Sequence, residues 1–151
     1  MELCFRFDNA KTLWYQWLSI DTAYFNSVLF TVSAFNDVCH RSPRGGYVLD
    51  EMDGSNAILA FTPQTRKYLR RTMGQLQERL YDQERQYDDI TIAIIITLAM
   101  TADVVRDDAA CRAHVEGLMR IVQARGGVKA FEKNRQLQIK LLRRVCATLC
   151  S

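Results

Sequence analysis

The segment DDITIAIIITLAM, residues 88–100, decides between the fold classes open to this chain. Its apolar run from Ile90 to Met100 is rich in β-branched side chains, which also suit a buried strand. We predict a helix, because Asp88 or Asp89 can cap its first turn and no second strand-like segment exists to pair with it. A helix that is apolar all round is surrounded by protein. The run is too short to span a bilayer, so it predicts the central helix of an all-α domain.

The composition agrees with one helical domain. The chain has 151 residues, of which 48% are hydrophobic and only 7 are Gly and 2 are Pro. This length fits a single domain over 1–151, and so few breakers argue against many short strands. The net charge of +3 is low for a duplex-DNA-binding protein, although basic residues gather from Lys129 onward. Five scattered cysteines and an N-terminus without a basic-then-apolar start favour a reduced, non-secreted protein.

Apolar periodicity predicts helices on the N-terminal side of the central run. Asp21 is a candidate N-cap, and a short aromatic turn or helix around Trp14 and Trp17 precedes it. The helix that follows should turn inward a stripe of Phe25, Val28, Leu29, Val32 and Phe35. A turn-rich loop over residues 40–56, marked by Pro43, Gly45, Gly46 and Gly54, should come next.

A further helix should begin at Thr62 and Pro63, an N-cap residue followed by proline at the first helical position. Its expected apolar seam is Leu69, Met73, Leu76 and Leu80, and its basic residues should occupy the other faces: Arg66, Lys67, Arg70, Arg71 and Arg79. Asp107 or Asp108 can cap the helix after the central run. A last helix should start near Asn134 and carry Leu137, Leu141, Leu142, Val145 and Leu149. The prediction is an antiparallel bundle or array of about five to six helices.

The stretch HVEGLMRIVQARGG, residues 114–127, allows two interpretations. A phosphate-binding loop places glycines before a helix, whereas Gly126 and Gly127 follow an amphipathic stripe that includes Val115, Leu118, Met119 and Val122. We therefore predict a helix with a glycine stop. His114 follows Cys111 by three residues, which could begin a zinc site, but no partner ligands have suitable spacing. A buried thiol and a hydrogen-bonded imidazole are the simpler interpretation, and we assign no metal and no catalytic base.

The order of these segments resembles the fungal-specific transcription factor domain. Five segments follow one another from about Trp14 to Leu142. They are the aromatic start, DTAYFNSVLFTVSAFNDV, YLRRTMGQLQERL, DDITIAIIITLAM and the H-x-x-G-L-x-x-[IV]-[VIL]-x-x-R-G-G block. The block places the motif residues at His114, Gly117, Leu118, Arg125, Gly126 and Gly127. The resemblance implies an all-helical, nuclear regulatory region with no catalytic residues and no cofactor, sometimes responsive to small molecules.

The sequence departs from the family pattern in two ways. No two cysteines stand as C-x-x-C, so the zinc cluster that reads DNA is absent from these residues. The region LQIKLLRRVCATLC is basic where relatives often continue with an apolar segment. We therefore expect a domain that is partial relative to the family, either a divergent stand-alone module or a non-functional fragment of a full-length regulator. Apolar helix faces without their usual neighbours favour self-association or a protein partner.

Three functional hypotheses remain, and no enzyme is among them. The first is a regulatory and interaction module of a transcription factor that does not itself bind specific DNA sequences. The second is a domain that binds a small ligand in a pocket lined by Trp14, Tyr15, Trp17, Tyr24, Phe25, Tyr68, Tyr81 and Tyr87. The third is a nucleic-acid or nuclear-import patch at Arg66, Lys67, Arg70 and Arg71, although a solvated helix face explains these bases equally well.

Overall fold

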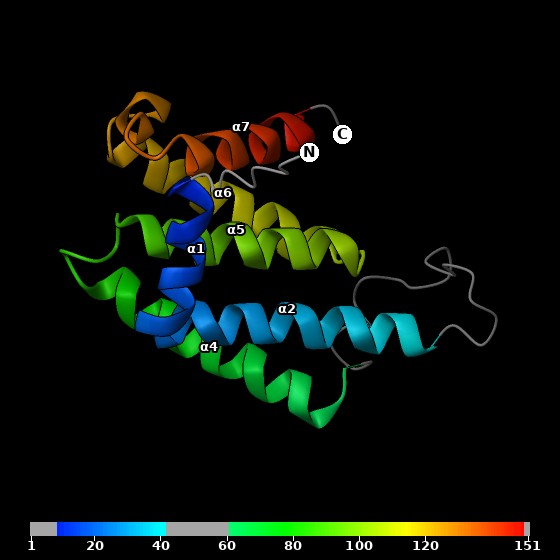
Figure 1. The fold of residues 1–151 in the computed structure, drawn as a ribbon. Coiled ribbons are helices and arrows are strands. Elements are labelled where there is room, and N and C mark those ends of the chain that lie inside the picture. The colour runs from blue at the N-terminus through cyan, green and yellow to red at the C-terminus, as the bar shows by residue number, and fades with distance from the viewer. Residues whose placement is uncertain (1–8, 42–60, 150–151) are drawn as a thin grey trace, which may run out of the picture.

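The computed structural model describes residues 9–41 and 61–149 of the protein. That part contains no strand, and it consists of α1 (Asn9–Ile20), α2 (Thr22–Arg41), α4 (Pro63–Tyr81), α5 (Asp89–Val104), α6 (Asp108–Ala124), the 3₁₀ turn η2 (Val128–Phe131) and α7 (Arg135–Leu149). The consecutive helices from α2 to α7 run in alternating directions (Figure 1). The all-α prediction is confirmed, and most of the predicted loop over residues 40–56 lies outside the described residues.

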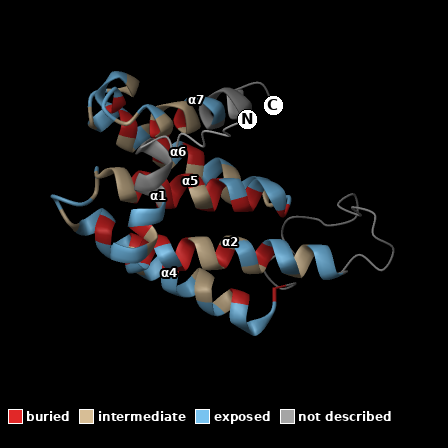
Figure 2. Ribbon diagram, viewed as in Figure 1, coloured by how far each residue is buried: buried red, intermediate tan, exposed pale blue. Residues whose placement is uncertain are grey.

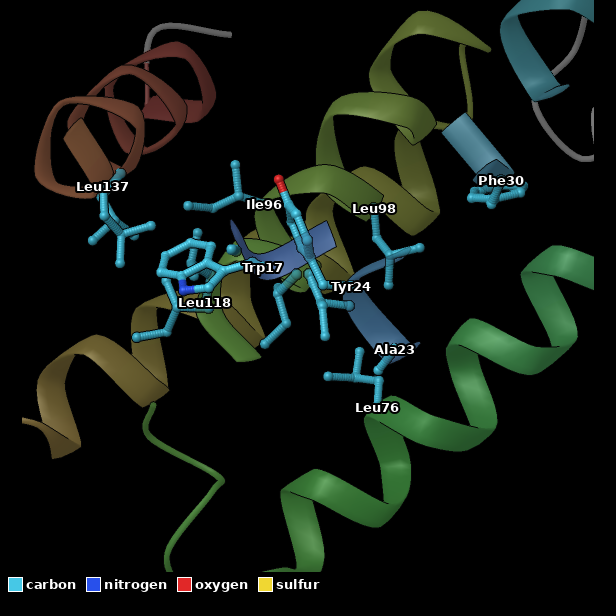
Figure 3. Packing of buried hydrophobic residues seen from close by; sticks show 14 of the residues in the cluster. Trp17, Ala23, Tyr24, Phe30, Leu76, Ile96, Leu98, Leu118 and Leu137 are labelled. Carbon is cyan, nitrogen blue, oxygen red and sulfur yellow. The ribbon is translucent and has the colours of Figure 1, made fainter. Parts of the chain in front are cut away.

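The apolar run forms the central helix, α5. It contacts α2, α4, α6 and α7. The first helix, α1, runs across the direction of these helices and contacts α2 and α7 (Figure 1). Every residue from Thr91 to Ile96 is buried, so no side of this stretch faces water (Figure 2). The core extends from Phe30 of α2 to Leu137 of α7, which lie on opposite sides of the cluster in Figure 3. A helix without a polar face is stable here because protein surrounds it.

Capping side chains begin α2, α4, α5, α6 and α7 at or near the predicted starts. Each accepts a hydrogen bond from the backbone N–H three residues later, which satisfies one of the unpaired donors of a first helical turn. The donor–acceptor distances are 2.9 Å for Asp21, 3.3 Å for Thr62, 2.6 Å for Asp88, 3.0 Å for Asp107 and 3.2 Å for Asn134. The structure thus selects Asp88 and Asp107 from the two acidic pairs in the sequence.

The predicted inward stripe of α2 was wrong for Phe25, Val32 and Phe35 and correct for Val28, which packs against the core. Phe25, Val32 and Phe35 are 44%, 61% and 52% exposed. The inward face carries the small residues Ser27 and Ala34, both fully buried, together with larger residues such as Phe30. Small side chains let α4 and α5 approach α2 closely, and the Ser27 hydroxyl donates to the Tyr24 carbonyl at 2.7 Å, which removes most of the cost of its burial.

The predicted seam of α4 was correct only in part. Leu76 is buried and Leu69 packs against the core, but Met73 and Leu80 are 42% and 39% exposed. Their expected places are taken by three buried polar residues, Thr65, Thr72 and Arg79. Arg79, which we expected on an outer face, is 3% exposed because acceptors at the starts of α2 and α5, the buried Asp21 and the partly exposed Asp88, compensate its charge.

The aromatic segment before Asp21 is a full helix, α1, rather than a short turn. Trp17 is buried and meets the Tyr24 ring edge-on, with the ring centroids 5.8 Å apart. Burial raises the pKa of the Tyr24 hydroxyl to about 12. The predicted burial of Trp14, Val145 and Leu149 is not tested, because these three lie outside the residues whose side chains the structure describes.

Candidate functional site

A cavity of about 350 Å³, partly open to solvent, lies between α2, α4, α5 and α6. Phe30 of α2 and Phe61, which precedes α4, form an aromatic wall, with their rings edge-on and their centroids 5.7 Å apart. Leu69 and Met73 of α4 and Leu98 of α5 add aliphatic surface. Figure 3 shows Phe30 and Leu98 together at one side of the core. Phe30 and Phe61 had not been proposed for a pocket, because the sequence does not show which aromatic residues a cavity will reach.

Among the described lining residues, Asp107 and His114 are ionisable; Asp107 caps α6, and His114 lies in the first half of that helix. Burial lowers the pKa of the His114 imidazole, and the carboxylate of Asp107 opposes this shift. The imidazole is therefore uncharged at neutral pH and offers one N–H donor and one acceptor nitrogen. Asp107 is held in place because its Oδ1 accepts the Ala110 N–H. An apolar cavity with a few placed polar groups has the chemistry of a small-molecule site.

The apolar residues of the sequence block that contains His114 pack against the core, and its two terminal glycines end the helix. Leu118 is fully buried, and Val115 and Val122 lie beside it in the core-facing stripe of α6. Gly126 and Gly127 adopt φ values of +109° and +81°, and the Gly127 N–H donates to the Val122 carbonyl at 2.8 Å. These values confirm the glycine stop, which closes the last turn of α6 with a hydrogen bond to the carbonyl five residues earlier.

Arg125 fastens the end of α6 to two other helices. Its guanidinium donates to the Tyr87 carbonyl at 2.9 Å and to the Asp89 carboxylate at 2.5 Å. It also lies over the Phe131 ring, with its central carbon 4.3 Å from the ring centroid. The second Asp89 oxygen accepts from the Asn134 side chain at 2.8 Å, which reaches the start of α7. The sequence had suggested only a capping role for Asp89, because capping explains an acidic pair without a distant partner.

A second polar cluster joins α2, α4 and α5. The Arg79 guanidinium forms an ion pair with Asp21 and donates to Asp88 at 3.2 Å and to the Thr91 hydroxyl at 3.4 Å. Burial lowers the pKa of Arg79, and the Asp88 carboxylate opposes the shift. Arg85 approaches Asp21 at 3.8 Å from the solvent side. The two acids that cap neighbouring helices therefore share one buried cation, which is an arrangement that helix periodicity does not reveal.

The predicted basic patch lies on the outer side of α4. Lys67, Arg70 and Arg71 are exposed and Arg66 is partly exposed, on the side opposite the buried residues of that helix. A nucleic-acid or import role for this patch stays a prediction. Within residues 9–41 and 61–149, no group of three His, Cys, Asp or Glu side chains is placed to hold a metal ion, and no helix is long and apolar enough to cross a membrane.

The fold and the cavity describe an all-helical domain with a partly open space of small-molecule size between α2, α4, α5 and α6. Residues 18–149 match the model of the fungal specific transcription factor domain. The chain therefore belongs to that family, and it is a regulatory domain of the fungal transcription factor type. Comparison with curated proteins and with solved structures found no match.

Proposed function

We propose that this domain acts as an interaction module in nuclear transcriptional regulation and works through protein–protein contacts. The observation that carries the proposal is the outward face of α2. This face, defined by Phe25, Val32 and Phe35, is apolar and largely exposed. Large apolar side chains grouped on one helix face are typical of interaction surfaces. No C-x-x-C pair occurs in the 151 residues, so the proposal gives them no zinc-cluster contact with DNA.

The chemistry of this face favours a second copy of the chain as its partner. No charged residue occurs in α2 between Thr22 and Asn36. Two such faces can therefore pack against each other about a two-fold axis without opposing like charges. Phe35 and Phe25 supply aromatic area, which contributes strongly to the binding energy of many interfaces.

Sedimentation velocity over a range of protein concentrations tests the proposal. The wild-type chain should self-associate, and Val32→Glu should weaken the association by at least roughly 100-fold, because the dimer would bury an unpaired carboxylate. Leu142→Glu is the matched control, since Leu142 is 45% exposed on α7 and lies outside this face. A wild-type protein that stays monomeric at tens of micromolar, or a Val32→Glu variant that associates like wild type, would contradict the proposal.

A further inference from the structure

The cavity between α2, α4, α5 and α6 is large enough for a small molecule and too small for a folded segment. Its volume of about 350 Å³ lies at the lower end of the range of about 300–1,000 Å³ that ligand pockets occupy. The lining comes from four helices that pack against one another, so the space is set by the fold. A molecule of one or two fused rings fits such dimensions.

The walls select an apolar occupant. Phe30 and Phe61 offer ring surface, and Leu69, Leu98 and Val105 offer aliphatic surface. Side chains that line an empty space lack dispersion contacts on one side, and an apolar molecule would supply them. Small residues at positions 110 and 113 of α6 leave room for it, because alanine side chains reach only a short way into the cavity.

The polar end of the cavity selects the charge of the occupant. The uncharged imidazole of His114 can both donate and accept a hydrogen bond, which matches a hydroxyl group. The Asp107 carboxylate lines the same space and would repel an anion. A carboxylic acid of otherwise equal shape is therefore a poorer ligand than an alcohol or a phenol.

We propose that this cavity binds a small, uncharged, mainly apolar molecule with one hydroxyl group, which His114 holds by a hydrogen bond beside Asp107. The site is separate from the outward face of α2, and it does not require that face to form an interface. Its test accordingly measures ligand binding and does not measure association.

Isothermal titration calorimetry with 2-naphthol and 2-naphthoate tests the site, since the two probes share a ring system and differ in charge. The wild-type chain should bind 2-naphthol saturably with one site per chain, and it should bind 2-naphthoate at least roughly tenfold more weakly. Ala110→Phe fills the cavity and should weaken 2-naphthol binding by at least about tenfold. Ala124→Phe, at an exposed position of α6 outside the cavity, should leave binding unchanged.

A His114→Leu variant tests the polar contact, because leucine retains bulk and removes the hydrogen bond. It should lose most of the preference for 2-naphthol over naphthalene while still binding both compounds. If Ala110→Phe does not fold, as circular dichroism would show, Ala113→Leu replaces it as the filling variant. The proposal is overturned if 2-naphthol does not bind saturably, if the filling variant binds it like wild type, or if 2-naphthoate binds as tightly.

Discussion

Removal of the buried charge at Arg79 should be among the most destabilising polar substitutions in this domain. Arg79 is 3% exposed, and its main partner, Asp21, is 8% exposed. Arg79→Met keeps most of the aliphatic stem and leaves the Asp21 carboxylate without its cation. Breaking a buried pair in this way costs about 3–5 kcal/mol. Arg85 lies 3.8 Å from the same carboxylate and offsets a part of this, so we expect a loss of about 2–4 kcal/mol in the free energy of unfolding.

The reciprocal variant isolates the charge from the helix cap. Asparagine caps helices as well as aspartate does, so Asp21→Asn keeps the bond to the Tyr24 N–H, while an uncharged amide NH2 group replaces the oxygen that accepts from Arg79. Arg79 would retain Asp88 at 3.2 Å, and the expected loss is about 2 kcal/mol. The double variant should cost less than the two single variants together, with a coupling energy of about 2 kcal/mol, because the second change removes a charge that the first has already left unpaired.

Urea unfolding followed by circular dichroism measures these differences. Arg85→Met is the matched control, since its side chain is 53% exposed and approaches the same Asp21 carboxylate. Solvent screens that contact, and the control should lose about 0.5 kcal/mol or less. The reasoning is refuted if Arg79→Met destabilises no more than Arg85→Met does, or if the double variant equals the sum of the single variants.

Four further substitutions test the sequence block that ends α6. Gly127→Ala should lower the free energy of unfolding, measured in urea, by about 1–3 kcal/mol, because φ is +81° at this position. Gly117→Ala should raise it by about 0.5–1 kcal/mol, because Gly117 lies inside the helix with open space around it. Arg125→Gln should cost about 1–3 kcal/mol and speed amide exchange at the start of α7; unchanged exchange would argue against this link. His114→Gln should reduce the fall in the free energy of unfolding on acidification. Burial lowers the pKa of His114 in the folded state, so the unfolded chain takes up this proton first as the pH falls and is favoured at low pH. Parallel profiles of unfolding free energy against pH for wild type and variant would disprove this.

Local chemistry explains why the helix starts could be predicted. A capping side chain acts on a donor three residues away, so Asp21, Thr62, Asp88, Asp107 and Asn134 are recognisable without knowledge of the fold. The buried run of α5 was equally clear, since a helix apolar on every side has no alternative to burial. The stop at Gly127 follows from its own conformational freedom.

The orientation of the amphipathic helices could not be predicted in the same way. α2 has one face with large apolar residues and another with Ser27 and Ala34, and hydrophobicity alone favours the first. The contacts of α2 with both α4 and α5 favour burial of the face with Ser27 and Ala34, because small residues permit close approach of these helices. Arg79 follows the same logic, since its burial depends on two acids from distant parts of the chain. The cavity depends on four helices at once and has no signature in any one of them.

The two proposals meet in α2. Phe30, on its inward side, lines the cavity, while Val32, on its outward side, belongs to the proposed interaction face. A molecule in the cavity contacts α2 directly, and its affinity can therefore differ between the associated and the free chain. Any such difference must change the association constant of the chain by the same factor. Sedimentation with and without saturating 2-naphthol measures that factor for wild type. Ala110→Phe should abolish the effect of 2-naphthol on association, and an undiminished effect would show that 2-naphthol acts from elsewhere.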